Sequence, residues 1–173
     1  METPTLKKII YRGGVVSFRV PADWAEEYDN GGEGVYYKPG DNTGTLGLNV
    51  LTGTVPAGRL ATEGYLAEQL KADSVKYGVA IEPLGESAVM IRYDMPGRER
   101  GQSIKIRCWR IFQALPPNNF RHVLFTYTLL AEQFDQQGFV LEMESLDREI
   151  AVVELAPTLG QLPSPKKPWW RPW

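Results

Sequence analysis

Cys108 and His122 are the only cysteine and the only histidine in the chain, and together they form a candidate pair for nucleophilic chemistry. A thiol becomes a nucleophile when an imidazole lies within hydrogen-bond distance. A four-residue loop at 116–119 would join two strands as a hairpin and place Cys108 opposite Tyr127. In this register Cys108 and His122 lie on opposite faces of the sheet. We therefore expect no catalytic dyad and interpret Cys108 as a buried structural thiol.

Other segments that resemble chemical sites each lack part of the required pattern. With one histidine and one cysteine, a zinc site would need mostly carboxylates. Residues 41–44 lack the ligand spacing of a calcium loop. The glycines at 31–34 and 44–47 are not followed by the Lys-Ser/Thr of a phosphate loop. We expect no catalytic residue, no metal and no cofactor.

The same hairpin register predicts an apolar sheet face that contains one arginine. Arg110 would lie among the core positions Ile104, Ile106, Cys108, Phe112, Val123, Phe125, Tyr127 and Leu129. A buried, unpaired guanidinium is costly. Three explanations stay open: a bulge shifts the phase of the strand, a carboxylate from another element such as the final helix pairs with Arg110, or Arg110 serves a polar pocket.

The opposite face of the predicted hairpin mixes basic, aromatic and polar side chains, namely Lys105, Arg107, Trp109, Ile111, His122, Leu124, Thr126 and Thr128. One interpretation is a sheet face partly covered by a helix. The other is a concave surface for an acidic peptide or helix, with Trp109 as its anchor. The candidate binding residues are Trp109, Arg107, Arg110, His122 and three tryptophans near the end of the chain, Trp169, Trp170 and Trp173.

The elements that must position these residues follow from hydrophobic periodicity. Alternating and β-branched runs predict strands at 15–20, 34–38, 45–54, 86–94, 103–115 and 120–130. Apolar residues at steps of three and four predict helices at 61–77, ended by Gly78, and at about 139–153. Residues 22–28 read as a short polar segment. The order βββ-α-βββ-α indicates an α+β fold, a mostly antiparallel sheet of about six strands with helices packed on it as an αβα sandwich.

Composition sets the broad class. The chain has 173 residues, and we expect one domain at 1–157 with a C-terminal extension at 158–173. A formal net charge of -2 argues against a nucleic-acid partner. No apolar run has the length of a signal peptide or a transmembrane segment. A single cysteine suits a reducing compartment, so we expect a cytoplasmic protein.

The extension has an unusual composition. Its prolines exclude a helix or a central strand and favour an extended, polyproline-like conformation. Trp169, Trp170 and Trp173 could each bury ~200 Å². Four destinations stay open: the chain's own domain, a second copy in a homodimer, a separate protein partner, or a membrane interface, where tryptophan beside lysine and arginine is typical.

The N-terminal half of the chain resembles the opening of PsbP-like domains. The shared residues are Phe18, Val20, Pro21 and Trp24, then Gly31, Gly32 and Gly34, then Val35, Tyr36 and Tyr37. The stretch 146–150 is similar to the last helix of that fold, and the resemblance covers roughly 12–155. The family includes photosystem II extrinsic subunits, a Ran-binding import factor and bacterial chaperones of secretion effectors. It implies an antiparallel sheet between helices and a role in protein binding, and it carries no common catalytic residues.

Together these features predict a non-catalytic protein-binding module, adaptor or chaperone-like, whose partner is another protein or a second copy of itself. The alternative is a small apolar-ligand-binding protein with a pocket near Arg110 and the tryptophans. An enzyme is the third possibility.

Overall fold

A computed structural model describes residues 4–159 of the chain. Trp169, Trp170 and Trp173, and with them most of the expected extension, lie outside the described residues. Within residues 4–159, ten strands and two α-helices follow each other: β1 (Leu6–Tyr11), β2 (Val16–Pro21), β3 (Ala25–Tyr28), β4 (Gly34–Tyr37), β5 (Thr45–Thr54), α1 (Glu63–Tyr77), β6 (Glu82–Leu84), β7 (Ala88–Glu99), β8 (Gln102–Leu115), β9 (Asn119–Leu130), α2 (Gln137–Ile150) and β10 (Glu154–Leu155).

The strands form two antiparallel sheets. The larger has seven strands in the order β3-β4-β5-β9-β8-β7-β6, and the smaller has three in the order β1-β2-β10. Every ladder is antiparallel, from β1–β2 to β8–β9. The predicted α+β class and the sheet-and-helix architecture are confirmed. The prediction of one sheet is wrong in one respect, because the strand predicted at 15–20, β2, pairs with β1 and β10 and lies outside the seven-stranded sheet.

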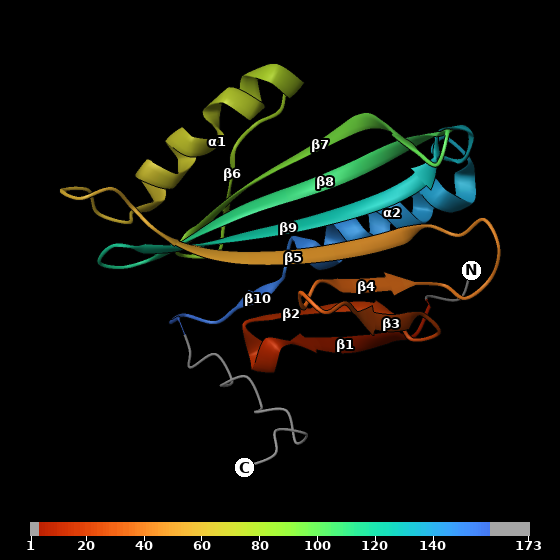
Figure 1. Cartoon of the computed structure of the whole chain (residues 1–173), viewed down its shortest axis with the longest axis horizontal. Helices are drawn as coiled ribbons and strands as arrows, with labels where there is room; N and C mark the ends of the chain where they lie inside the picture. Colours follow the sequence, from red (N-terminus) through yellow and green to blue (C-terminus); the bar gives the residue numbers. More distant parts are fainter. Residues whose placement is uncertain (1–3, 160–173) are drawn as a thin grey trace, which may run out of the picture.

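The layers are unequal on the two sides of the large sheet (Figure 1). On one side α1 packs on β7 and β8 through a cluster of Leu66, Leu70, Val89, Ile91, Phe112 and Ala114. On the other side α2 and the small sheet enclose the main core, which joins Phe18 and Val20 of β2 to Trp109, Phe125 and Tyr127 of the large sheet. The larger share of the apolar side chains therefore lies on the α2 side.

Local signals place the two helices. The Thr62 side chain accepts a hydrogen bond from the Tyr65 amide and caps the start of α1. Gly78 ends α1 in the left-handed conformation, at φ 63°, which glycine adopts without strain. Met143, Leu146 and Ile150, which the periodicity predicts as an apolar stripe, are buried on α2.

The last described residues are held by a buried arginine. Arg121 is 1% exposed, and its guanidinium donates to the carbonyls of Ala156 at 2.7 Å and Thr158 at 2.8 Å. It also donates to Oε1 of Gln113 at 2.5 Å. Burial lowers the pKa of Arg121. The chain thus reaches residue 158 on the α2 side of the sheet, close to the turn between β8 and β9.

Candidate functional site

The β8–β9 hairpin is one residue out of the predicted register. Leu115 pairs with Asn119, so the turn has three residues at 116–118, and Cys108 pairs with Thr126 rather than Tyr127. Because side chains alternate along a strand, a shift of one residue places the side chains of β8 on the opposite face, relative to β9, from the one predicted. Even-numbered positions of β8 and β9 point to the α1 side, and odd-numbered positions point to the core on the α2 side.

Among residues 4–159, α1 packs mainly on β7 and β8, and no other helix lies over the rest of the α1 side of the large sheet. The uncovered positions form cross-strand rows, such as Thr126 beside Gly47 beside Val35, and Leu124 beside Asn49. We call this surface the open face. It comprises Val35, Tyr37, Gly47, Asn49, Leu51, Ile106, His122, Leu124, Thr126 and Thr128.

Burial separates the open face sharply from the core. All ten of its residues are partly or fully exposed, and Leu51 is 61% exposed. The residues between them on β9, Val123, Phe125 and Tyr127, are each 0% exposed. The open face thus presents aliphatic side chains among threonine, asparagine and tyrosine. At the centre of the open face, Gly47 leaves space for the Thr126 side chain: a Cβ at Gly47 would lie 2.9 Å from Oγ1 of Thr126.

A charged cluster marks the border between the open face and α1. The Arg110 guanidinium forms an ion pair with Asp73 of α1, and its Nε donates to Nε2 of His122 at 3.1 Å. Among the explanations for Arg110, the structure supports a carboxylate, which comes from α1 rather than from the final helix. Burial, with the nearby Arg110 charge, lowers the pKa of His122 to about 4. His122 is therefore neutral at pH 7, with Nε2 occupied as an acceptor.

Cys108 and His122 share the α1 side, so the predicted reason for excluding a dyad is wrong. They are still no dyad, because Cys108 is opposite Thr126 and His122 is opposite Phe112, four residues along β8. At about 3.4 Å per residue their positions are offset by ~14 Å along the strands. Burial raises the pKa of the Cys108 thiol to about 11. The thiol is 3% exposed and stays protonated at neutral pH.

Trp109 and Arg107 lie on the opposite side of the sheet, beneath α2. Trp109 is 0% exposed, and its Nε1 donates to Oδ1 of Asp147 at 2.9 Å. Arg107 binds Asp94 through two hydrogen bonds and Asp147 at 3.2 Å, while Arg92 reaches Asp147 at 2.7 Å. The expectation that Trp109 anchors a ligand on one surface with His122 is wrong, because a one-residue register shift separates them. Trp109 is a core residue that fastens α2.

The rim of the open face carries acidic side chains on the β3–β4 side. Glu27 of β3 accepts a hydrogen bond from the Tyr37 hydroxyl, which raises the pKa of Tyr37. Glu33, just before β4, places its Oε1 3.9 Å from the Cβ position of Gly47. At the end of the face near Thr128, a hollow of about 400 Å³ opens between Thr45, Ile104 and Leu130. The open face thus has an aliphatic centre, an acidic side and a polar end.

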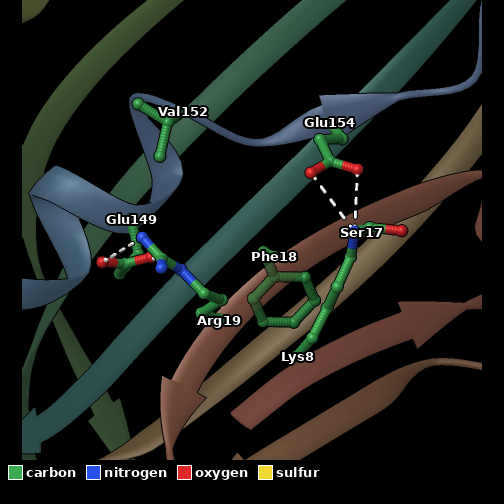
Figure 2. A pocket seen from close by; sticks show the side chains of 7 residues that line it. All are labelled: Lys8, Ser17, Phe18, Arg19, Glu149, Val152 and Glu154. Carbon is green, nitrogen blue, oxygen red and sulfur yellow. Dashed lines mark hydrogen bonds and ion pairs between the residues drawn. The ribbon is translucent and has the colours of Figure 1, made fainter. Parts of the chain in front are cut away.

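A second depression lies at the small sheet (Figure 2). It has a volume of about 270 Å³ and lies where β10 begins beside β2, with Phe18 and Ser17 between two ion pairs. Arg19 binds Glu149 of α2 at 2.7 Å, and Lys8 binds Glu154 of β10 at 3.0 Å. The four charges already satisfy each other across the depression. One ion pair joins α2 to β2, and the other joins β10 to β1 within the small sheet.

Within residues 4–159, no three His, Cys, Asp or Glu side chains gather as a metal-binding group. No helix in this part of the chain is long and apolar enough to cross a membrane.

No family model and no curated protein matches this chain. Among solved structures, a protein from Bacteroides thetaiotaomicron VPI-5482 aligns with 87% of this chain at 19% identity and a TM-score of 0.57, but the aligned part is 48% of that protein. The chain thus spans about half the length of that protein. LpqN of Mycobacterium tuberculosis, involved in cell envelope biogenesis, aligns over 88% of this chain and 91% of its own, at 11% identity and a TM-score of 0.52.

The Ran-binding protein Mog1p of Saccharomyces cerevisiae aligns over 88% of this chain and 96% of its own, at 9% identity and a TM-score of 0.49. At the identities of LpqN and the Bacteroides protein, a likeness shows the fold alone. LpqN has the PsbP-like fold, so the fold implied by the sequence resemblance is supported.

Proposed function

We propose that this chain is a non-catalytic protein-binding module, adaptor or chaperone-like, and that it binds its partner on the open face. One observation carries the proposal: a sheet face with exposed Leu51 and partly exposed Leu124, Ile106 and Val35 has no helix of the described residues over it. Uncovered apolar area rimmed by polar residues is typical of protein interaction sites. The threonines and asparagine between these residues offer hydrogen bonds, as interfaces that form and dissociate require.

The side chains that could have supported catalysis are engaged or inactive. The Cys108 thiol is buried with its pKa raised to about 11, and His122 accepts from Arg110. Asp147 of α2 accepts from Trp109 and two arginines. These arrangements stabilise the fold rather than prepare a reaction.

The chemistry of the open face describes its partner. Its aliphatic centre suits an apolar helix face or an extended segment, and Glu27 and Glu33 suit basic residues beside that segment. We expect a partner with an apolar stripe and a basic edge. This partner chemistry replaces the acidic peptide that the sequence suggested, because Arg107 and Lys105 lie on the other side of the sheet.

The proposal extends to the organisation and location of the chain. We propose a single domain over 1–157 that acts in the cytoplasm, where its one thiol, Cys108, stays reduced.

Affinity capture with matched variants tests the binding site. The full chain, the Leu51→Glu variant and the Leu141→Glu variant are each used to capture proteins from the source organism. Leu141 is an exposed leucine of α2, 44% exposed, so its substitution adds the same charge away from the open face. We expect a partner that the full chain and Leu141→Glu both retain and Leu51→Glu loses. Equal retention of every captured protein by all three chains would contradict the proposal.

A further inference from the structure

The point at which the chain leaves the described fold is fixed. Arg121 and Gln113 both donate to the carbonyl of Ala156, at 2.7 Å and 3.0 Å, and Arg121 also holds the carbonyl of Thr158. Arg121 is the third residue of β9, directly after the hairpin turn at 116–118. The described part of the chain therefore ends beside the end of the sheet at which β8 turns into β9.

Exposed leucines lead from this end of the sheet onto the open face. Leu60 is 66% exposed, in a loop that is bonded to the hairpin turn through Val55 to Asn118 and Ala61 to Pro117. Leu51 pairs with His122 in the row of the open face nearest to the turn. Leu124, in the following row, is partly exposed. These residues offer a discontinuous apolar path around the end of the sheet.

The segment 161–173 has the composition that this path and the acidic rim would accept. It carries Trp169, Trp170 and Trp173, three cations at Lys166, Lys167 and Arg171, and no acidic side chain. Each tryptophan can bury ~200 Å² of surface. The cations complement Glu33 and Glu27 at the far side of the open face.

The length of the segment is sufficient for this route. Trp169 lies eleven residues after Thr158. At about 3.1 Å per residue in an extended, proline-rich chain, the connection spans up to ~34 Å. By comparison, the whole 12-residue β9 spans ~40 Å. The tryptophans can therefore reach the rows of Leu51 and Leu124 without leaving their own molecule.

We propose that segment 161–173 docks on the open face of its own chain and competes with the partner for it. This inference rests on the proposed function, because it assigns a second occupant to the same surface. A tethered segment has an effective concentration on the order of 1 mM. If its isolated peptide binds with a Kd of about 100 μM, the segment would weaken partner binding about tenfold.

The test compares the full chain with a full-length variant in which Trp169, Trp170 and Trp173 are replaced by alanine. Backbone amide chemical shifts are recorded for both chains over a dilution series. We expect the largest differences at Leu51, His122 and Leu124, unchanged on dilution. A synthetic peptide of residues 161–173, added to the triple variant, should restore the full-chain shifts and should lose affinity at least tenfold when Leu51→Glu is also present. Leu141→Glu, which adds the same charge on α2, is the control and should leave the affinity for the peptide unchanged.

Several outcomes would overturn the inference. Shift differences away from the open face, or peptide binding that is indifferent to Leu51→Glu, would place the segment elsewhere. Differences that vanish on dilution together with a fall from dimer to monomer mass would assign the occupant to a second copy. Partner capture separates this inference from the proposed function: if Leu51→Glu abolishes capture but the triple variant captures no more than the full chain, the open face binds the partner and the segment does not compete.

Discussion

Nε of Arg110 donates to Nε2 of His122 across 3.1 Å, from one strand of the sheet to the next. This bond assigns the acceptor nitrogen of His122 and shows that both side chains lie on the α1 side. Arg110 is in turn paired with Asp73 of α1. The border between α1 and the open face is therefore set by an ion pair and a neutral imidazole.

The neutral state of His122 predicts how stability depends on pH. In the unfolded chain a histidine titrates near 6.5, whereas in the folded protein burial and the Arg110 charge lower the pKa of His122 to about 4. The unfolded state therefore binds the extra proton between these values. The contribution of His122 to the free energy of unfolding should therefore increase from pH 4 to pH 6.5 and be complete above pH 6.5.

His122→Gln should remove this dependence. The contribution of His122 is about 1 to 3 kcal/mol over that interval, since the ring is partly exposed. Urea unfolding at several pH values measures the difference between the variant and the natural chain, which cancels the other titrating groups. If that difference were the same at pH 4 and pH 7, the account of His122 would be wrong.

Glu142 should make stability depend on pH in the opposite direction. Its carboxyl accepts from the Tyr127 hydroxyl, and burial raises the pKa of Glu142. A raised carboxyl pKa contributes stability below the unfolded value, and this contribution is lost as pH rises through the folded value. Glu142→Gln should therefore stabilise the protein at pH 7 relative to the natural chain and lose this advantage below pH 4. Thermal unfolding at both pH values is the measurement, and a larger advantage at low pH would refute the assignment.

Asp147 predicts a large stability loss when its carboxyl group is removed. Asp147→Ala leaves Nε1 of the buried Trp109 without its acceptor and removes the partner of Arg92. We expect a loss of about 2 to 4 kcal/mol in the free energy of unfolding. Asp147→Asn keeps an oxygen for Trp109 and should cost clearly less. Equal effects of the two substitutions would mean that charge, rather than the Trp109 hydrogen bond, is what α2 requires.

Arg121 predicts a local effect on the last described residues. Arg121→Met removes the donors to Ala156 and Thr158, so this stretch should open more often. The amide of Ala156, which donates to the carbonyl of Val15, reports the opening through hydrogen exchange. We expect exchange at least about tenfold faster, which corresponds to 1.4 kcal/mol. Arg19→Met, which removes an exposed cation bound to Glu149, should leave Ala156 unchanged. If the Ala156 amide of Arg121→Met exchanged as slowly as in the natural chain, the Arg121 hydrogen bonds would not be what holds this stretch closed.

Periodicity was sufficient for the helices and long strands, because Met143, Leu146 and Ile150 follow a helical stripe and β9 alternates strictly. It missed β3, where Glu26 and Glu27 give a polar edge strand with no apolar alternation. It also missed β1 and the two short strands β6 and β10, which have little pattern to detect. Short edge strands owe their conformation to the neighbour they pair with.

The candidate site was harder to predict than the fold. On β8 both faces are apolar, with Ile104 and Ile106 on one side and Trp109 and Ile111 on the other. The alternation along β8 therefore did not show which of its faces belongs to the core. The assumption of a four-residue loop at 116–119, where the turn has three residues, assigned the wrong face. On β9 the predicted surface positions His122, Leu124, Thr126 and Thr128 do lie together on the open face. That Arg110 pairs with a helix remote in sequence required the three-dimensional packing.

Site-specific photocrosslinking tests the central claim most directly. A photoreactive phenylalanine analogue replaces Leu51 on the open face in one chain and Leu141 on α2 in another, and irradiation in living cells is followed by identification of the adducts. The account predicts a defined partner adduct from position 51, stronger when Trp169, Trp170 and Trp173 are replaced by alanine, and none from position 141. A partner crosslinked from position 141 and not from position 51 would contradict it.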